Sequence, residues 1–227
     1  MPKARSKDPL LAATTSILLP AVKPFGFQRR TARSLDRICD DVLHSISPWY
    51  SGWGGRDFYV PYSVMPLVPP TDFEYVARGT RLWDPIGKSY SWPGQTHELA
   101  DDSMQRAVQL LQAEVLPNFF ARVETTESFL TYLQQEPKAD HHEHFRRACC
   151  LVKLQRLDEA MLELNAAILG YVADGRDWCF PKIAQCEEMR KAISAGTSRQ
   201  LYDEWKTQTI KNLRLEKIIP HKSTAEG

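Results

Sequence analysis

The sequence predicts an α+β protein, with a small antiparallel sheet packed with helices, followed by an all-helical C-terminal region. Apolar residues recur at helical spacing over residues 8–19, residues 25–92 are rich in aromatic residues and proline, and helical spacing dominates the rest. The chain of 227 residues is 43% hydrophobic and 25% charged, which is typical of a globular protein with a sizeable core. We expect an α+β domain over residues 1–136, a helical extension over 137–219 and a disordered tail over 220–227.

The first predicted helix, residues 8–19, ends at Pro20, because proline lacks a backbone N–H. Gly26 can adopt a positive φ, and we expect it to turn the chain from the helix into the first strand. Phe25 and Phe27 flank this glycine and are expected to anchor the strand against the helix. This segment is interpreted as a packing corner without chemistry of its own.

Alternating residues and turn signals then predict short strands at residues 42–46, 58–65, 81–83 and 89–92. The glycine-rich residues 51–55 predict a hairpin loop between the first two of them. Because Pro61 and Pro66 cannot donate to a ladder, the strand that holds them is expected at a sheet edge or to end in a bulge.

Capping residues and apolar stripes predict the helices of the second half. One helix should begin at residues 101–103 and end near Pro117, and a second should begin at Thr125 or Thr126 and bury Phe129, Leu130 and Leu133. An antiparallel pair is expected over residues 139–168, followed by helices near residues 181–193 and 198–217.

The order of a helix, a Gly-Phe-x-Arg corner, strands and a helix that ends in Leu-Pro-x-Phe-Phe resembles an uncharacterised bacterial domain-of-unknown-function family. Its members share an LL…GF-x-R start and an LPxFxxxxTxExFLxYL end. The matching residues are Leu18, Leu19, Gly26, Phe27, Arg29, Trp92, Leu116, Pro117, Phe119, Phe120, Thr126, Phe129, Leu130, Tyr132 and Leu133. The resemblance covers residues 10–136 and implies a small α+β domain without known catalytic residues. Some such domains resemble immunity or partner-binding proteins.

The helical extension carries a second resemblance. Small and large residues alternate over residues 148–167 as in a tetratricopeptide helix pair, with Gln155 at the position where glycine is usual. One repeat is visible, whereas a solenoid needs about three for stability of its own. We therefore expect the helical extension to pack against the first domain for its stability.

Charge and cysteine usage narrow the classes of partner and compartment. Residues 1–37 are basic, but the net charge of the whole chain is only +1. This net charge does not favour a nucleic-acid partner. The acidic residues 96–136 can attract the basic segment within the fold. Apolar stretches stay well short of the ~18 residues that a membrane span needs. Five cysteines without a C-x-x-C pair indicate a reduced, cytoplasmic protein.

Motifs for catalysis or cofactor binding are weak in this sequence. His141 and His144 share a helix face within a His-His-Glu-His run, but zinc would need further ligands, so we expect an exposed helix start and no metal or other cofactor. Cys39 stands among acidic residues, which raise a thiol pKa and oppose a nucleophilic role. Phosphate-binding loops and G-x-S-x-G motifs are absent from the sequence, and we expect no catalytic residue.

Tyrosine, tryptophan and arginine are the residues that most often anchor protein interfaces. They predict a contact surface made of Trp49, Tyr50, Trp53, Arg56, Arg78, Arg81 and Trp83. The function expected from it is non-catalytic binding of another protein, with an immunity-type inhibitor of a bacterial toxin as the narrower hypothesis. The alternative is a small-ligand-binding protein or enzyme with an anion pocket around Arg78, Arg81 and Trp83.

Overall fold

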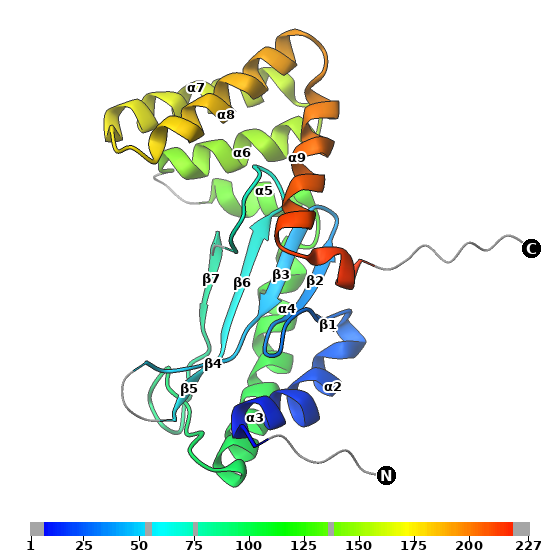
Figure 1. Ribbon diagram of the computed structural model, residues 1–227, viewed down its shortest axis with the longest axis vertical. Helices are drawn as coiled ribbons and strands as arrows, with labels where there is room; N and C mark the ends of the chain where they lie inside the picture. Colours follow the sequence, from blue (N-terminus) through cyan, green and yellow to red (C-terminus); the bar gives the residue numbers. More distant parts are fainter. Residues whose placement is uncertain (1–6, 53–55, 75–76, 136–138, 220–227) are drawn as a thin grey trace, which may run out of the picture.

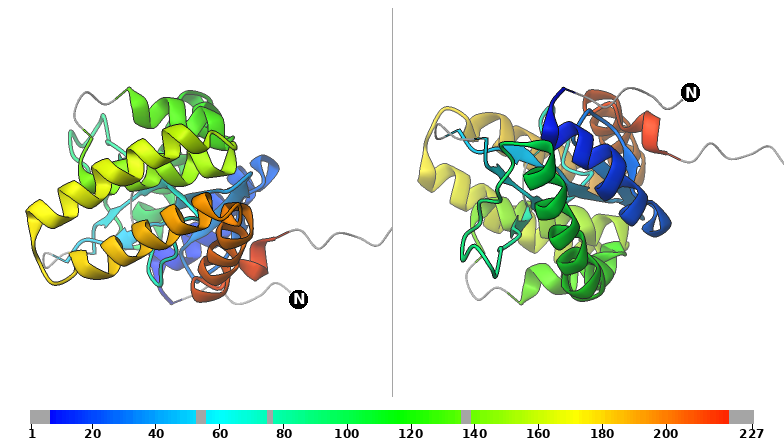
Figure 2. Two further views of the ribbon diagram at one scale, coloured as in Figure 1. Left: turned by 90° about the horizontal axis from the view of Figure 1, so that it is seen from above. Right: turned by 90° about the horizontal axis from the view of Figure 1, so that it is seen from below.

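A computed structural model describes residues 7–52, 56–74, 77–135 and 139–219 of the chain. It confirms the predicted α+β class. A twisted antiparallel sheet occupies the middle of the molecule, the N-terminal helices and α3 lie at one end, and α6 to α9 lie at the other (Figure 1). In Figure 2 the C-terminal helices stand in front of the sheet when the molecule is viewed from above, and the N-terminal helices and α3 stand in front of it from below. Among the described residues, no helix has the length and apolar character needed to cross a membrane.

The main sheet has the strand order β1-β2-β3-β6-β7, with every neighbouring pair antiparallel. Its strands are β1 (Gln28–Arg29), β2 (Leu35–Cys39), β3 (Val42–Ile46), β6 (Pro61–Pro66) and β7 (Arg78–Arg81). A separate two-stranded sheet joins β4 (Trp49–Tyr50) to β5 (Phe58–Tyr59). Strand β3 was predicted with the bounds that it has, and all five of its residues are buried because it lies at the centre of the sheet.

The prediction of one strand over residues 58–65 is wrong, because this stretch divides between the two sheets. Its second half, β6, lies between β3 and β7 rather than at an edge. Pro61 and Pro66 are the first and last residues of β6, so the missing N–H groups fall at the ends of the ladder. The Pro61 carbonyl still accepts a hydrogen bond from the Ser47 N–H at 3.1 Å. The hairpin loop was predicted between the strands at residues 42–46 and 58–65, whereas the strands that flank it are β4 and β5, in which Trp49 pairs with Tyr59. Residues 53–55 of this loop lie outside the described residues.

The first helix continues past Pro20, which corrects the predicted boundary. It comprises α1 (Pro9–Ala13), a π-helical turn (Thr14–Leu18), α2 (Leu19–Val22) and a short 3-10 turn (Lys23–Phe25). In the π-helical turn the Leu19 N–H bonds to the carbonyl of Thr14, five residues back. We infer that this shift lets the helix pass through a proline, which cannot donate the usual bond.

The same arrangement recurs in the second long helix. There α3 (His97–Leu110) runs into a π-helical turn (Leu111–Val115) and then α4 (Leu116–Asn118). Each π-helical turn thus stands directly before a Leu-Pro pair, Leu19-Pro20 or Leu116-Pro117. Helix α3 begins at His97 with the Thr96 side chain as its N-cap, so the predicted start at residues 101–103 is wrong by one turn.

Gly26 ends the first helix with a φ of 87°, as the sequence predicts. Phe27 is fully buried and packs edge-to-face on Phe120, with ring centroids 5.3 Å apart. Phe25 is 42% exposed, so the prediction that both phenylalanines anchor the strand is wrong for this residue. The left-handed turn at Gly26 sends the two rings in different directions.

Replacing Gly26 with valine should lower the free energy of unfolding by about 1–3 kcal/mol, because a β-branched residue is strained at positive φ. A β-carbon there would meet only Arg37 Cδ at 3.8 Å, so the cost is conformational rather than steric. Gly26→Asn is the matched control, since asparagine tolerates this region and should cost much less. Urea unfolding measures both variants, and equal stabilities would contradict the role of the turn.

The remaining helices largely follow the predicted pattern. They are α5 (Thr126–Gln134), α6 (His141–Lys153), α7 (Leu157–Asp174), α8 (Cys179–Ser194) and α9 (Ser198–Asn212), with 3-10 turns at Phe120–Val123 and Leu215–Ile218. Thr125 and Ser128 form a reciprocal capping box at the start of α5. Phe129, Leu130 and Leu133 are buried, as predicted.

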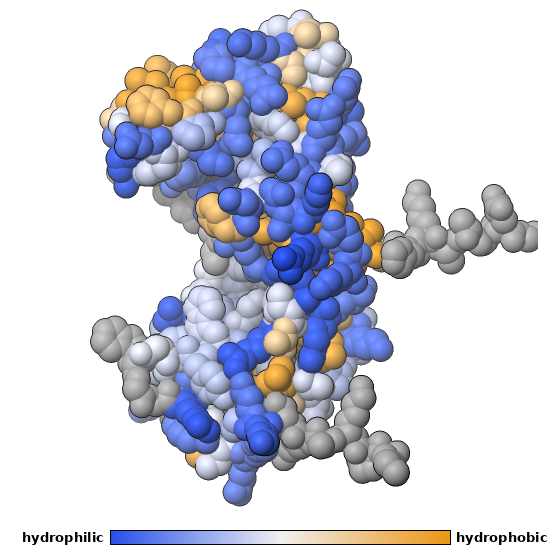
Figure 3. All heavy atoms as spheres, in the orientation of Figure 1, coloured by the Kyte–Doolittle hydropathy of each residue, from blue (hydrophilic) through white to orange (hydrophobic). Residues whose placement is uncertain are grey.

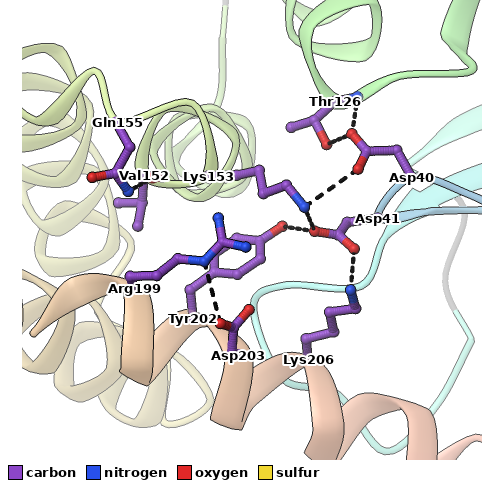
Figure 4. Close-up of polar contacts among 10 residues, drawn as sticks. All are labelled: Asp40, Asp41, Thr126, Val152, Lys153, Gln155, Arg199, Tyr202, Asp203 and Lys206. Atoms are coloured by element: carbon purple, nitrogen blue, oxygen red, sulfur yellow. Dashed lines mark hydrogen bonds and ion pairs between the residues drawn. The ribbon is translucent and has the colours of Figure 1, made fainter.

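A polar cluster around the buried Asp41 connects the sheet to the helical region (Figure 4). We call it the joint; it consists of Asp40, Asp41, Thr126, Lys153, Tyr202 and Lys206. Asp40 and Asp41 form the turn between β2 and β3, since Cys39 pairs directly with Val42. Asp40 accepts hydrogen bonds from the backbone N–H of Thr126 at 2.9 Å and from its hydroxyl at 2.5 Å.

Asp41 is the centre of the joint. Its side chain is 2% exposed and pairs with Lys153 of α6 and Lys206 of α9. The Tyr202 hydroxyl, also on α9, donates to the same carboxylate at 3.1 Å. Because one sheet turn receives side chains from two helices of the C-terminal region, Asp41 fixes that region against the sheet.

Candidate functional site

The predicted contact residues are divided by the structure into several groups. Trp53 lies outside the described residues. Trp49 is 48% exposed, whereas its neighbour Tyr50 turns inward and donates from its hydroxyl to Asp8 Oδ1 at 2.7 Å. Arg56 is exposed near the end of the β4–β5 hairpin. The two neighbours in β4 therefore face different surroundings, as expected for successive residues of a strand.

Arg78 is separated from Arg81 and Trp83. Its guanidinium donates to Glu143 Oε2 of α6 at 2.5 Å, and it is therefore held against the helical region. Arg81, at the other end of β7, lies over the Tyr59 ring with 4.1 Å between its guanidinium carbon and the centroid. Residues three apart in a strand face opposite sides of a sheet, which explains the separation.

Trp83 and Tyr90 meet edge-to-face with ring centroids 4.9 Å apart, and both remain close to half exposed. Tyr62 packs edge-to-face on Phe119 at 5.1 Å, which joins the sheet to the segment after α4. Large aromatic side chains that stay exposed together are unusual on a free surface and often mark an interaction site. Figure 3 shows a pale, weakly polar surface on the flank of the molecule where β7 lies.

Two adjoining hollows follow this flank, with volumes of about 520 and 450 Å³. Both are lined by Tyr62, Thr80, Arg81 and Tyr90, so they lie side by side, and we call the two together the β7 groove. The larger hollow adds Trp83, Glu114 and Phe119 to the lining, and the smaller adds Trp49 and Gly79.

Strand β7 is an edge of the main sheet. The ladder shows which of its backbone N–H and C=O groups point toward the sheet and which point away. The Leu82 N–H bonds to the Val60 carbonyl at 2.9 Å, so the backbone N–H of Leu82 points toward the sheet. Arg81 pairs with Pro61, whose carbonyl is directed to Ser47 on the other side. By alternation, the backbone N–H and C=O of Arg81 and of Gly79 point away from the sheet, toward the open edge.

The expected anion pocket does not assemble around Arg78, Arg81 and Trp83. Arg78 pairs with Glu143, as described above. Asp84, which is 1% exposed, accepts from Arg106 Nη1 at 3.1 Å and from the Ile86 N–H at 3.0 Å. Arg81 is thus the one member of the predicted basic pair that lines the β7 groove, where Glu114 accompanies it.

The histidine run at the start of α6 divides among different partners. His144 Nδ1 lies 2.6 Å from Glu163, and His141 Nε2 lies 3.6 Å from Asp174. His142 Nδ1 lies 2.9 Å from the Tyr171 hydroxyl. Within the described ranges, no group of three or more histidine, cysteine or acidic side chains is arranged to hold a metal ion.

Cys39 has a raised thiol pKa, but not for the predicted reason. Burial is the main cause, and Glu124 adds to it while Arg37 opposes it. Neighbouring aspartates along the strand point elsewhere, and two of them belong to the joint. The basic and acidic segments of the sequence do meet, through an ion pair between Arg37 and Glu124 at 3.0 Å.

Comparison with known proteins gives no family model, no curated protein and no solved structure that matches this chain. The resemblance to an uncharacterised bacterial family therefore stays a prediction. A proposed function therefore rests on the geometry of the described residues.

Three aromatic residues of the β7 groove were missed by the sequence prediction. Tyr62 and Tyr90 lie within residues 25–92, which are rich in aromatic residues, and their spacing alone does not distinguish a packed side chain from an exposed one. Phe119 belongs to the Leu-Pro-x-Phe-Phe motif, which was interpreted as packing. Phe120 of that motif is fully buried, whereas Phe119 reaches the groove.

Proposed function

We propose that this chain is a non-catalytic protein-binding module and that the β7 groove takes an extended segment of its partner. The observation that supports it is the edge strand β7, whose outward N–H and C=O groups at Gly79 and Arg81 lie beside exposed aromatic rings. An extended peptide can add to such an edge as a further strand. Backbone hydrogen bonds then supply affinity, and side-chain pockets supply specificity.

The two hollows of the groove match this mode of binding. A strand added beside β7 would place alternate side chains on the face where Tyr62, Trp83 and Tyr90 gather. Trp49 and Trp83 lie in different hollows, so a segment that contacts both must run along the groove. Arg81 and Glu114 provide one charge of each sign for polar selection.

The narrower proposal is an immunity-type inhibitor, in which the bound segment belongs to a bacterial toxin. It requires that binding at the β7 groove blocks the toxin. Co-expression with the product of a neighbouring toxic gene tests it: growth should be rescued by the wild-type chain and not by a groove variant. Rescue by a groove variant that retains its fold would contradict this narrower proposal.

The general proposal is tested with peptides selected from a phage-displayed library on the immobilised full chain. Trp83→Ala should weaken the selected peptides by about 2 kcal/mol, which is about thirtyfold in Kd. Arg81→Pro should have a similar effect, because it removes an outward N–H without removing a ladder hydrogen bond. Isothermal titration calorimetry measures both, with circular dichroism as the test of folding.

Leu169→Ala is the matched control, because Leu169 is 71% exposed and belongs to α7, which lies among the helices beyond the sheet and away from β7 (Figure 1). It should leave peptide affinity unchanged. Peptides that bind Trp83→Ala and Arg81→Pro as tightly as the wild type would show that the groove is not the contact surface.

A further inference from the structure

A second depression lies away from the β7 groove, where the loop after β6 meets the helical region. In Figure 1 this loop extends from the end of β6 toward α6. The pocket has a volume of about 260 Å³. Its lining residues come from the loop and from three helices and are Pro69, Pro70, Thr71, Phe73, His142, Phe145, Arg146, Tyr171 and Lys182.

The lining has an unusual charge pattern. His142, Arg146 and Lys182 are basic, the lining contains no acidic side chain, and the rest is mainly proline and aromatic. Asp72 acts on Lys182 and Asp140 acts on His142 and Arg146, but neither aspartate lines the pocket. A negatively charged group in this pocket would therefore meet several positive or donating groups and no direct repulsion.

Lys182 is one of the lining residues whose charge is affected by these surroundings. Burial among apolar side chains lowers the pKa of its amine, because the charged form loses solvation. Its amine donates to Gln185 Oε1 at 3.1 Å, a neutral acceptor. A bound anion would offset the lost solvation far better than an amide oxygen can.

His142 is held in a fixed orientation at the same pocket. The Trp178 ring stacks on it at 5.1 Å with an interplanar angle of 13°, and its Nδ1 lies 2.9 Å from the Tyr171 hydroxyl. Burial raises the pKa of Tyr171, so its hydroxyl stays protonated and can donate to Nδ1. A neutral imidazole that accepts at Nδ1 carries its proton on Nε2, which is then a donor for a ligand.

We propose that this pocket binds a small organic carboxylate with an apolar body. Lys182 and Arg146 would face the carboxylate, with His142 as a neutral donor, and Phe73, Phe145 and the prolines would cover the apolar part. Pockets of this kind, mostly apolar with a few convergent polar groups, are typical small-molecule sites. This binding is independent of the partner proposed for the β7 groove.

Benzoate is a suitable probe, with benzamide as its neutral counterpart, and calorimetry on the full chain is the measurement. Benzoate should bind at millimolar concentration or better, and benzamide should bind at least about tenfold more weakly. Lys182→Met should weaken benzoate by about tenfold or more. Lys191→Met, which removes an exposed lysine of the same helix, should change nothing.

Phe73→Asp provides a second variant, because Phe73 is 64% exposed and its replacement should leave the fold intact. Both ligands should lose the contact with the Phe73 ring, and the new carboxylate should repel benzoate alone, so benzoate should be weakened clearly more than benzamide. The proposal is overturned if benzoate fails to bind, if benzamide binds equally well, or if folded Lys182→Met and Phe73→Asp both bind benzoate as the wild type does. Peptide binding at the β7 groove should persist in both variants, so the two proposals fail separately.

Discussion

Replacing Asp41 with asparagine should lower the free energy of unfolding by about 3 kcal/mol, because it removes the charge that Lys153 and Lys206 share. Asp41 itself is 2% exposed, while the two lysine side chains are 19% and 30% exposed. The lysines can turn partly toward water, which keeps the expected loss at the lower end for a broken buried pair. Asparagine keeps the size of the side chain, so the loss reports charge rather than a cavity.

Asp203→Asn is the matched control, since Asp203 lies on α9 beside the joint (Figure 4). It pairs with Arg199 at 3.2 Å, and both side chains are more than half exposed. An exposed pair of this kind contributes between about 0 and 1 kcal/mol, so the control should change the free energy of unfolding only slightly. Urea unfolding measures both variants. Similar small losses for Asp41→Asn and Asp203→Asn would show that the joint does not hold the helical region to the sheet.

The effect of Asp41→Asn should also depend on pH. Burial by itself raises the pKa of Asp41, but the hydrogen bonds and charges of Lys153 and Lys206 lower it below the ordinary value of 3.8. A carboxylate with a lowered pKa in the folded state contributes stability above its ordinary pKa and loses it as pH falls through the lowered one. The difference in unfolding free energy between wild type and variant should therefore be full at neutral pH and shrink in acid, below about pH 4. A constant difference down to low pH would mean that the charge of Asp41 is not responsible.

The structure confirms several of the sequence predictions that rest on local patterns. Strand β3, the Thr125 cap of α5 and the positive φ of Gly26 each depend on residues within a few positions of one another. The predicted effects of the prolines on the helix and strand that contain them were less accurate, because these effects depend on the backbone around each proline. The π-helical turn before Pro20 keeps the helix intact, and the ends of β6 accommodate Pro61 and Pro66.

The joint and the β7 groove depend on contacts that sequence patterns do not specify. Asp41 bonds to Lys153 and Tyr202, which are 112 and 161 residues away along the chain. The groove combines Trp49, Arg81 and Trp83, which were predicted, with Phe119 from a motif that appeared to serve packing. Composition predicts a contact surface among the aromatic residues, but only the ladder register shows which backbone groups of β7 face outward.

Replacing Gly79 with alanine should have an effect as large as that of Asp41→Asn, about 3 kcal/mol from backbone strain and overpacking together. Gly79 has a φ of 144°, and a β-carbon at this position would lie 2.2 Å from the Tyr62 carbonyl oxygen and 2.6 Å from Ser63 Cα. Both obstacles are backbone atoms of β6, so relief requires β7 to move away from its neighbour.

Gly52→Ala is the matched control, because a β-carbon there meets nothing within 4 Å. Urea unfolding should separate the two variants clearly. Since β7 forms the open edge of the sheet, Gly79→Ala should also abolish binding of the selected peptides, including under conditions where most of the chain stays folded. A Gly79→Ala protein with wild-type stability and peptide affinity would show that β7 tolerates displacement, and the backbone assignment of the groove would then be wrong.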